Sequence, residues 1–135
     1  MTKTVSRRQA RRAAFVLTYQ HDLRPDTPLA ELCAQHAVDT GVPTDAYTLA
    51  AVEGVAGTTA QLDAAIDRVA AGWTSDRLGA VERAILRLAS WELREGDAPR
   101  AVVIDEAIEL TKRYASAEAS AFVNGVLAAI ASEIE

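Results

Sequence analysis

One stretch constrains the fold of this chain more than any other: Arg77 to Glu95, RLGAVERAILRLASWELRE. Drawn as a helix with roughly 100° between residues, it gathers its polar side chains on a narrow stripe and leaves apolar side chains over the rest. A surface helix buries one face, whereas an apolar arc this wide needs neighbours on several sides. The pattern therefore predicts the central helix of an all-α domain. The polar stripe consists of Arg83, Arg87, Ser90 and Arg94.

Two carboxylates interrupt this apolar arc. Glu82 and Glu92 lie inside it, and a buried carboxylate without a partner is costly. We expect both to sit at the edge of the packing, in ion pairs with arginines.

Length and composition limit the class of protein. A chain of 135 residues fits one domain, or two small bundles that share a core. Aromatic residues make up only 5% of it, and alanine is abundant, which favours closely packed helices over sheets. Cys33 is the single cysteine, so no internal disulfide can form and we expect a cytoplasmic protein. No signal-peptide pattern opens the sequence and no apolar run approaches a membrane span, so no membrane contact is expected.

Charge is distributed unevenly along the chain. Residues 1–24 hold six basic residues against one acidic, a local balance of +5, although the whole chain has a formal charge of −5. The remaining residues therefore carry −10. A basic arm on an acidic body indicates a polyanionic partner for the arm.

The basic residues lie on a predicted first helix. Ser6 and Gln9 have the spacing of a capping box, so a helix should run from there to about Asp22. Cations in the first turns of a helix face the positive end of its dipole, and each costs about 0.3–1 kcal/mol. One face of the helix nevertheless gathers arginines and two aromatics: Arg8, Arg11, Arg12, Phe15 and Tyr19.

This placement favours a ligand over a purely structural role. Stability alone would have selected acidic residues there, whereas arginines interleaved with aromatics suit phosphates and unstacked bases. The alternative is a solvated basic face, with Phe15 and Tyr19 packed into the core. The residues favour nucleic acid and leave the alternative open.

Turn signals divide the rest of the chain into further helices. Glycines at positions 54 and 57 leave it open whether the segment before Gly72 is one bent helix or two. Asn124 and Gly125 disfavour mid-helix positions, so they suggest a close helix crossing or a side-chain hydrogen bond. The expected helices cover 29–38, the region from Thr44-Asp45 to before Gly72, the central stretch capped by Ser75 or Asp76, 100–114, and the residues after Ser116.

Nothing in the sequence is equipped for catalysis. His21 and His36 lie on different predicted helices without further ligands at metal-binding spacing, and Cys33 has no neighbour that would lower its thiol pKa. No phosphate loop, nucleophile elbow or zinc-protease motif occurs. Glu106 and Glu109 are expected to be ordinary charges of an exposed helix face. We interpret the chain as a binding module.

Several motifs occur in a fixed order: RRQARRAAFVLTYQ at the start, then AVERAILRLASWEL, AP, AVVIDEAIELTKRY and FVNGVL in the C-terminal half. Together they resemble the NusB family of bacterial transcription antitermination factors, whose members have an arginine-rich start ending in a tyrosine. Trp73 and Arg77 fit the linking segment of that family. The resemblance spans nearly the whole chain and is weakest between Leu23 and Tyr47.

The resemblance implies an all-α fold of about six or seven helices in two small bundles, residues 1–72 and 73–135, packed around the central helix. It implies a non-enzymatic factor without a cofactor that binds the boxA element of nascent RNA jointly with NusE, a ribosomal protein of the small subunit. The pair would then help RNA polymerase read through termination signals, notably in ribosomal RNA operons.

The resemblance also places the RNA-binding residues. A second patch would lie at the start of the last helix, although a carboxylate there is also favoured by the helix dipole alone. Matched position by position, the arginine-rich start gives Arg7, Arg8, Arg11, Arg12 and Tyr19, and the second patch gives Glu118 and Phe122.

Other functions stay open. The helical domain could be a protein–protein adaptor without RNA binding, or a homodimer formed through its first helix, which would cover the arginines. It could also be the accessory domain of an RNA methyltransferase, but the chain contains no segment that would bind S-adenosylmethionine.

Overall fold

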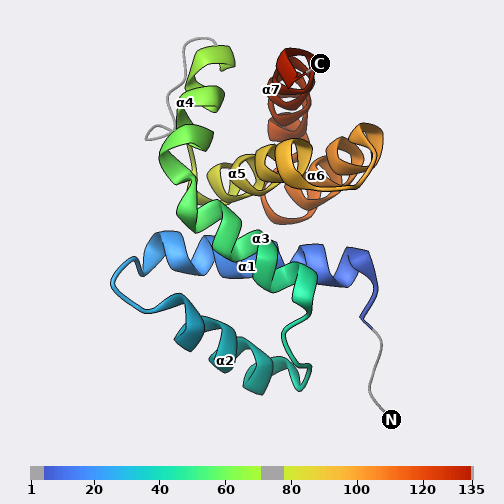
Figure 1. The fold of residues 1–135 in the computed structure, drawn as a ribbon. Coiled ribbons are helices and arrows are strands. Elements are labelled where there is room, and N and C mark those ends of the chain that lie inside the picture. Colours follow the sequence, from blue (N-terminus) through green and yellow to red (C-terminus); the bar gives the residue numbers. More distant parts are fainter. Residues whose placement is uncertain (1–4, 71–77, 135) are drawn as a thin grey trace.

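The computed structural model describes residues 5–70 and 78–134, and the regular structure within these ranges is entirely α-helical (Figure 1). The predicted all-α fold of six or seven helices is therefore confirmed. Trp73, Arg77 and the expected cap at Ser75 or Asp76 lie outside the described residues. The helices are α1 (Arg7–Leu23), α2 (Leu29–Thr40), α3 (Ala46–Gly57), α4 (Thr59–Val69), α5 (Ala80–Glu95), α6 (Arg100–Tyr114) and α7 (Ala117–Ile134).

Side-chain caps begin several of these helices. Ser6 Oγ accepts from the amide of Gln9 at 3.1 Å, and the Ser6 amide donates to Gln9 Oε1 at 2.9 Å, so the predicted capping box of α1 is confirmed. Asp45 accepts from the amide of Tyr47 at the start of α3. Ser116 Oγ accepts from the amide of Ala119 and satisfies a free donor at the start of α7.

Helix α5 is the centre of the packing. It lies against α1, α3, α4, α6 and α7, and Ile85, Leu86 and Leu88 are each at most 2% exposed. The prediction of a central helix from the wide apolar arc is confirmed. The helix begins at Ala80 with Gly79 as its N-cap, three residues later than the sequence pattern suggested.

Most of the polar stripe of α5 faces other helices, and only Arg94, near its end, is exposed. Arg83 binds Asp22 of α1 at 2.6 Å, and Arg87 binds both Asp22, at 3.1 Å, and Asp63 of α4, at 2.8 Å. Burial disfavours the charge on Asp22, but hydrogen bonds from Arg83 and Arg87 outweigh it and lower the pKa of the carboxyl group. This network joins α1, α4 and α5.

The helices divide into two halves that share one core. Figure 1 shows α1, α2 and α3 in one half, with α5, α6 and α7 in the other. Helix α4 packs mainly on α5 and α7, and Arg68 of α4 binds Glu133 of α7 at 2.6 Å. Helix α3 ends and α4 begins at Thr58, so this segment forms two helices and not one bent helix. The expected division into bundles of residues 1–72 and 73–135 stays a prediction.

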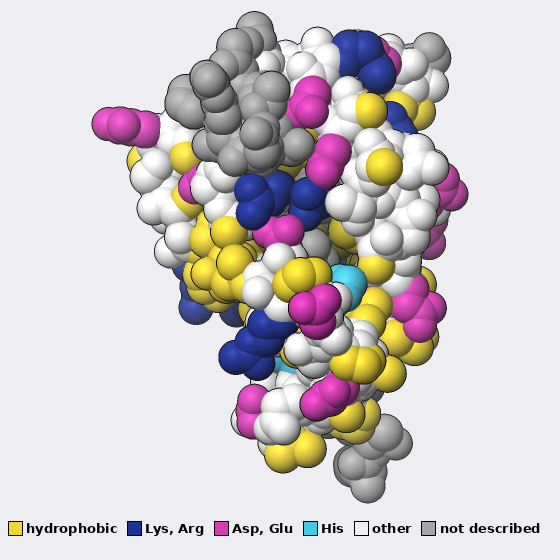
Figure 2. All heavy atoms as spheres, turned by 90° about the vertical axis from the view of Figure 1, so that its left-hand side faces the viewer, with side chains coloured by type: hydrophobic (Ala, Val, Ile, Leu, Met, Phe, Trp, Pro, Cys, Tyr) yellow, Lys and Arg dark blue, Asp and Glu magenta, His cyan; other side chains and the backbone are white. Residues whose placement is uncertain are grey.

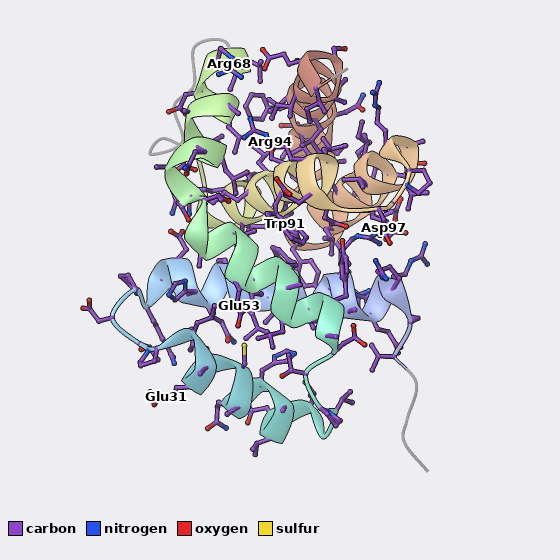
Figure 3. The ribbon with its side chains drawn as sticks, viewed as in Figure 1. Glu31, Glu53, Arg68, Trp91, Arg94 and Asp97 are labelled. Carbon is purple, nitrogen blue, oxygen red and sulfur yellow. The ribbon has the colours of Figure 1, made fainter. Side chains whose placement is uncertain are left out.

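Two glycines within helices have different surroundings. A Cβ atom at Gly54 would collide with the indole nitrogen of Trp91, which lies where α5 meets α3 (Figure 3). A Cβ atom at Gly125 would meet nothing within 4 Å, and Asn124 beside it is exposed. The close helix crossing suggested for Gly125 lies instead at Gly54.

By length and composition α7 could cross a membrane, which the sequence analysis did not anticipate. Its large apolar residues Val123, Val126, Leu127 and Ile130 are each at most 3% exposed and belong to the core. The core helix of a globular domain passes the same composition test.

Candidate nucleic-acid interface

The four arginines at the start of α1 form what we call the arginine face: Arg7, Arg8, Arg11 and Arg12. No acidic residue lies in the first turn of this helix, so the dipole at its N-terminus is not complemented from within. The four side chains differ in burial. Arg7 and Arg8 are exposed, Arg12 is partly buried, and Arg11 is only 4% exposed.

Arg11 belongs to a buried ion pair. Its Nε donates to both carboxylate oxygens of Glu92, at 3.0 and 2.9 Å, and Glu92 is 1% exposed. The hydroxyl of Tyr47 donates to the same carboxylate, and its burial together with this hydrogen bond raises the pKa of Tyr47. The cluster joins α1, α5 and α3.

This arrangement changes two expectations. Arg11, which the resemblance placed among the RNA-binding residues, is 4% exposed and pairs with Glu92, which gives it a role in packing; its contact with RNA stays a prediction. Glu92 does have the arginine partner that its position predicted, but in the middle of the core and not at its edge.

Arg7 and Arg8 form ion pairs at the surface. Arg7 lies 3.3 Å from Asp97 and 3.9 Å above the ring centre of Tyr47; Figure 3 places Asp97 beyond the end of α5, near the start of α1. Arg8 binds Glu106 of α6 at 2.9 Å, with 68% of its own side chain exposed. Arg7 pairs through Nη1 and Arg8 through Nε and Nη2, so each guanidinium keeps N–H donors that can bind a phosphate while its carboxylate partner stays in place.

A cavity of about 290 Å³, here called the α1–α6 cleft, lies between the arginine face and α6. Glu106, expected to be an ordinary surface charge, is only 16% exposed and lines this cleft. Arg12 lines both this cleft and a second cavity, and its Nε is buried without a hydrogen-bond partner in the described part of the chain. The residues lining the cleft are Arg8, Arg11, Arg12, Glu106, Glu109, Leu110 and Arg113.

Three aromatic rings lie close together near the cleft, two on α1 and one at the end of α6. Phe15 is 3% exposed and packs in the core, so for this residue the alternative of a packing role is correct. Its ring centre lies 6.4 Å from that of Tyr19, which is partly buried, and 5.2 Å from that of Tyr114. Tyr114 is 41% exposed. Tyr114 lies at the end of α6 and is not among the residues predicted from the sequence to bind RNA.

The expected second patch lies at the start of α7. Glu118 is exposed in the first turn of this helix, and Phe122, one turn later, is partly buried against the core. Their contact with RNA stays a prediction.

The face of the molecule shown in Figure 2 differs from the α1–α6 cleft in how its charged side chains are distributed. Basic side chains there lie beside acidic ones and do not form an extended basic surface. This view faces the left-hand side of Figure 1, whereas Asp97 and the start of α1 lie on the right. The unpaired arginine of the cleft is therefore the more distinctive cationic feature.

The described residues contain no cluster of side chains that could hold a metal ion. No three His, Cys, Asp or Glu side chains gather as a metal site within residues 5–70 and 78–134. Burial, and to a smaller extent Glu53, raise the pKa of the Cys33 thiol, which is the opposite of what activates a cysteine nucleophile.

Comparison with known sequences gives one family. The model of the NusB family matches residues 8–132. The transcription antitermination protein NusB of Acidothermus cellulolyticus is 42% identical over 126 residues, which is 93% of this chain and 86% of that protein. The protein of the same description from Saccharopolyspora erythraea is 40% identical over 128 residues, with the same two coverages of 93% and 86%.

Solved structures agree. NusB of T. maritima superposes with a TM-score of 0.87 at 36% identity and covers 97% of this chain and 94% of its own. A chain in the crystal structure of antitermination factors NusB and NusE in complex with dsRNA gives a TM-score of 0.80 at 32% identity. That match covers 94% of this chain and 96% of the other.

Proposed function

The chain belongs to the NusB family, and on this premise we propose that it is a transcription antitermination factor that binds boxA-type nascent RNA together with the ribosomal protein NusE. It acts in the cytoplasm, within an antitermination complex of RNA polymerase. It works by binding and not by enzymatic catalysis, it uses no cofactor, and it has no membrane partner.

The observation that carries this proposal is the state of the arginine face. Arg7 and Arg8 are exposed, Arg7 pairing with Asp97 above the Tyr47 ring and Arg8 pairing with Glu106, and Arg12 has a buried Nε without an acceptor among the described residues. Each arginine stands at the end of α1 where anions are favoured. RNA phosphates would supply the missing acceptors. The ion pair of Arg11 with Glu92 holds α1 against α5 on the buried side of the helix.

The likeness to a solved complex supports the same partners. The structure that joins NusB and NusE with dsRNA contains a chain of the same fold at 32% identity. Antitermination proteins of 40% and 42% identity support the same process.

The aromatic residues and the second patch are part of the proposal. Tyr19 and Phe122 are both partly buried and would offer a ring edge or face to an unstacked base. Glu118, being acidic, would accept from a base edge, since it would repel a phosphate. Its exposure in the first turn of α7 also fits the simpler role of complementing the helix dipole.

Surface composition gives little support to the homodimer or adaptor alternative. The exposed large apolar side chains of the described chain are spread over five helices, with two of them at opposite ends of α6, and scattered apolar residues are normal for a monomer. They are Leu23, Val38, Leu49, Val102, Tyr114 and Ile134.

The proposal is tested by titrating a fluorescent boxA RNA at several salt concentrations. Each phosphate contact with a single strand contributes about 0.7 to the slope of log affinity against log salt, so removing three arginines should lower the slope by about 2. The test variant is R7A/R8A/R12A. The charge-matched control, R24A/R94A/K112A, removes three exposed cations elsewhere and should keep the wild-type slope.

Either of two results would contradict the proposal. One is equal, weak binding of boxA and scrambled RNA by the wild type. The other is equal loss of affinity in the test variant and its control. Sedimentation of the wild type at the same concentrations separates the homodimer alternative, which predicts a dimer that responds little to salt.

A further inference from the structure

The side chains that line the α1–α6 cleft leave a net charge of +1 after their ion pairs are counted. Of its four arginines, Arg8 is paired with Glu106 and Arg11 with Glu92. Arg12 and Arg113 make no hydrogen bond or ion pair with any described residue. Among the carboxylates that line the cleft, Glu109 likewise makes no hydrogen bond or ion pair with a described residue. Two free cations against one free anion leave a charge of +1.

The two free arginines approach the cavity from opposite walls. Arg12 comes from α1, and its buried Nε–H has no acceptor. A buried donor without an acceptor is costly, so this group is arranged for a partner that the chain itself does not supply. Arg113 comes from the last turn of α6, and its guanidinium lies 5.6 Å from the ring centre of Tyr114.

We propose that the α1–α6 cleft binds a single phosphodiester of the RNA between Arg12 and Arg113. This inference rests on the proposed function and extends it to a residue on α6 that lies outside both patches expected from the sequence. A phosphodiester carries one negative charge, which matches the excess in the cleft. Its two non-bridging oxygens accept hydrogen bonds from Arg12 Nε and from the Arg113 guanidinium.

The neighbouring groups make this site selective for one phosphate. The Arg8–Glu106 pair neutralises Glu106 at one end of the cleft, and Glu92 neutralises Arg11, whose buried Nη2 is a further donor without an acceptor among the described residues. Glu109 opposes a second anion by repulsion. The RNA strand thus crosses from α1 to α6 at this point and does not follow α1 alone.

The first test compares R113A with K112A. Both variants remove one cation from neighbouring positions of α6, and both residues are exposed, but only Arg113 lines the cleft. Loss of one phosphate contact lowers the salt slope by about 0.7, which corresponds to roughly fivefold weaker binding at 0.1 M salt relative to 1 M. K112A should bind boxA RNA like the wild type, and E109Q should bind more tightly.

The second test locates the phosphate. A set of boxA RNAs, each with one neutral methylphosphonate linkage, is titrated against the wild type, R113A and R12K. One linkage should weaken binding to the wild type by roughly fivefold and have little further effect on R113A. R12K keeps the positive charge but loses the Nε–H donor, so its binding should also become insensitive to replacement of that one linkage.

The outcomes separate the two levels of the argument. If the wild type binds no RNA, the proposed function and the cleft site fail together. If the wild type binds boxA RNA with a steep salt slope but R113A equals K112A, only the cleft site is refuted. The same holds if R113A and R12K keep the full sensitivity to every linkage. Circular dichroism checks that each variant is folded.

Discussion

Replacing Arg11 separates the structural arginine of α1 from the ligand-binding ones. In R11A, the carboxylate of Glu92 would stay 1% exposed and keep only the Tyr47 hydroxyl as a hydrogen-bond donor. Removing one partner of a buried ion pair costs about 3–5 kcal/mol. R8A removes an exposed pair and should cost at most about 1 kcal/mol.

Thermal unfolding and urea denaturation, both followed by circular dichroism, measure the stability of both variants. For a chain of this size roughly 3 °C of melting temperature corresponds to 1 kcal/mol, so R11A should melt about 10–15 °C below the wild type. The matched control R8A should melt within about 3 °C of it. Replacing the whole cluster with apolar side chains, in R11M/E92M/Y47F, should recover most of the loss, because no buried charge is then left unpaired.

The reasoning would be refuted by an R11A variant that unfolds at the wild-type urea concentration and with the wild-type slope. The result would mean that Arg11 and Glu92 are accessible to water. Arg11 would then return to the set of candidate RNA contacts.

Three further predictions concern the packing. G54A should lose about 1–3 kcal/mol of unfolding free energy, because its new methyl group displaces the Trp91 indole. The control is G57A, because a Cβ atom at Gly57 meets nothing within 4 Å. In the same urea titration, G57A should be as stable as the wild type or more stable by up to about 1 kcal/mol. The folded-state pKa of Asp22 is lowered, so its contribution to stability is present above the unfolded pKa of about 3.9 and is lost as the pH falls through the folded value. D22N should therefore flatten the fall in melting temperature below pH 4. An unchanged acid profile would count against the ion-pair network of Asp22, Arg83 and Arg87. I85D buries an unpaired charge at a site that is 1% exposed and should abolish cooperative melting, so a native melting temperature in this variant would contradict the central position of α5.

Much of the fold could be predicted because its signals are local. The wide apolar arc of α5 required neighbours on several sides, and Ser6, Asp45 and Ser116 could be identified as caps from their side chains. The break between α3 and α4 could not, since two glycines and two threonines fit a bend as well as a stop. Contacts between distant segments, such as α4 with α7, leave no local pattern.

The candidate site could be predicted only in part, for a physical reason. Arg8, Arg11 and Arg12 cluster on one side of a helical projection, so periodicity alone cannot tell the buried one from the others. A signal did exist: Glu92 interrupts the apolar arc of α5 and requires a cation inside the core, and Arg11 is the one that meets it. The partners of Arg113 depend on where α6 lies beside α1, which the sequence does not specify.

The central claim is that this chain binds boxA RNA jointly with NusE. It is tested most directly by a filter-binding titration of boxA RNA and a scrambled control, with and without NusE. The account predicts a preference for boxA that strengthens when NusE is present and disappears in R7A/R8A/R12A. Equal, weak binding of both RNAs, unchanged by NusE, would contradict it.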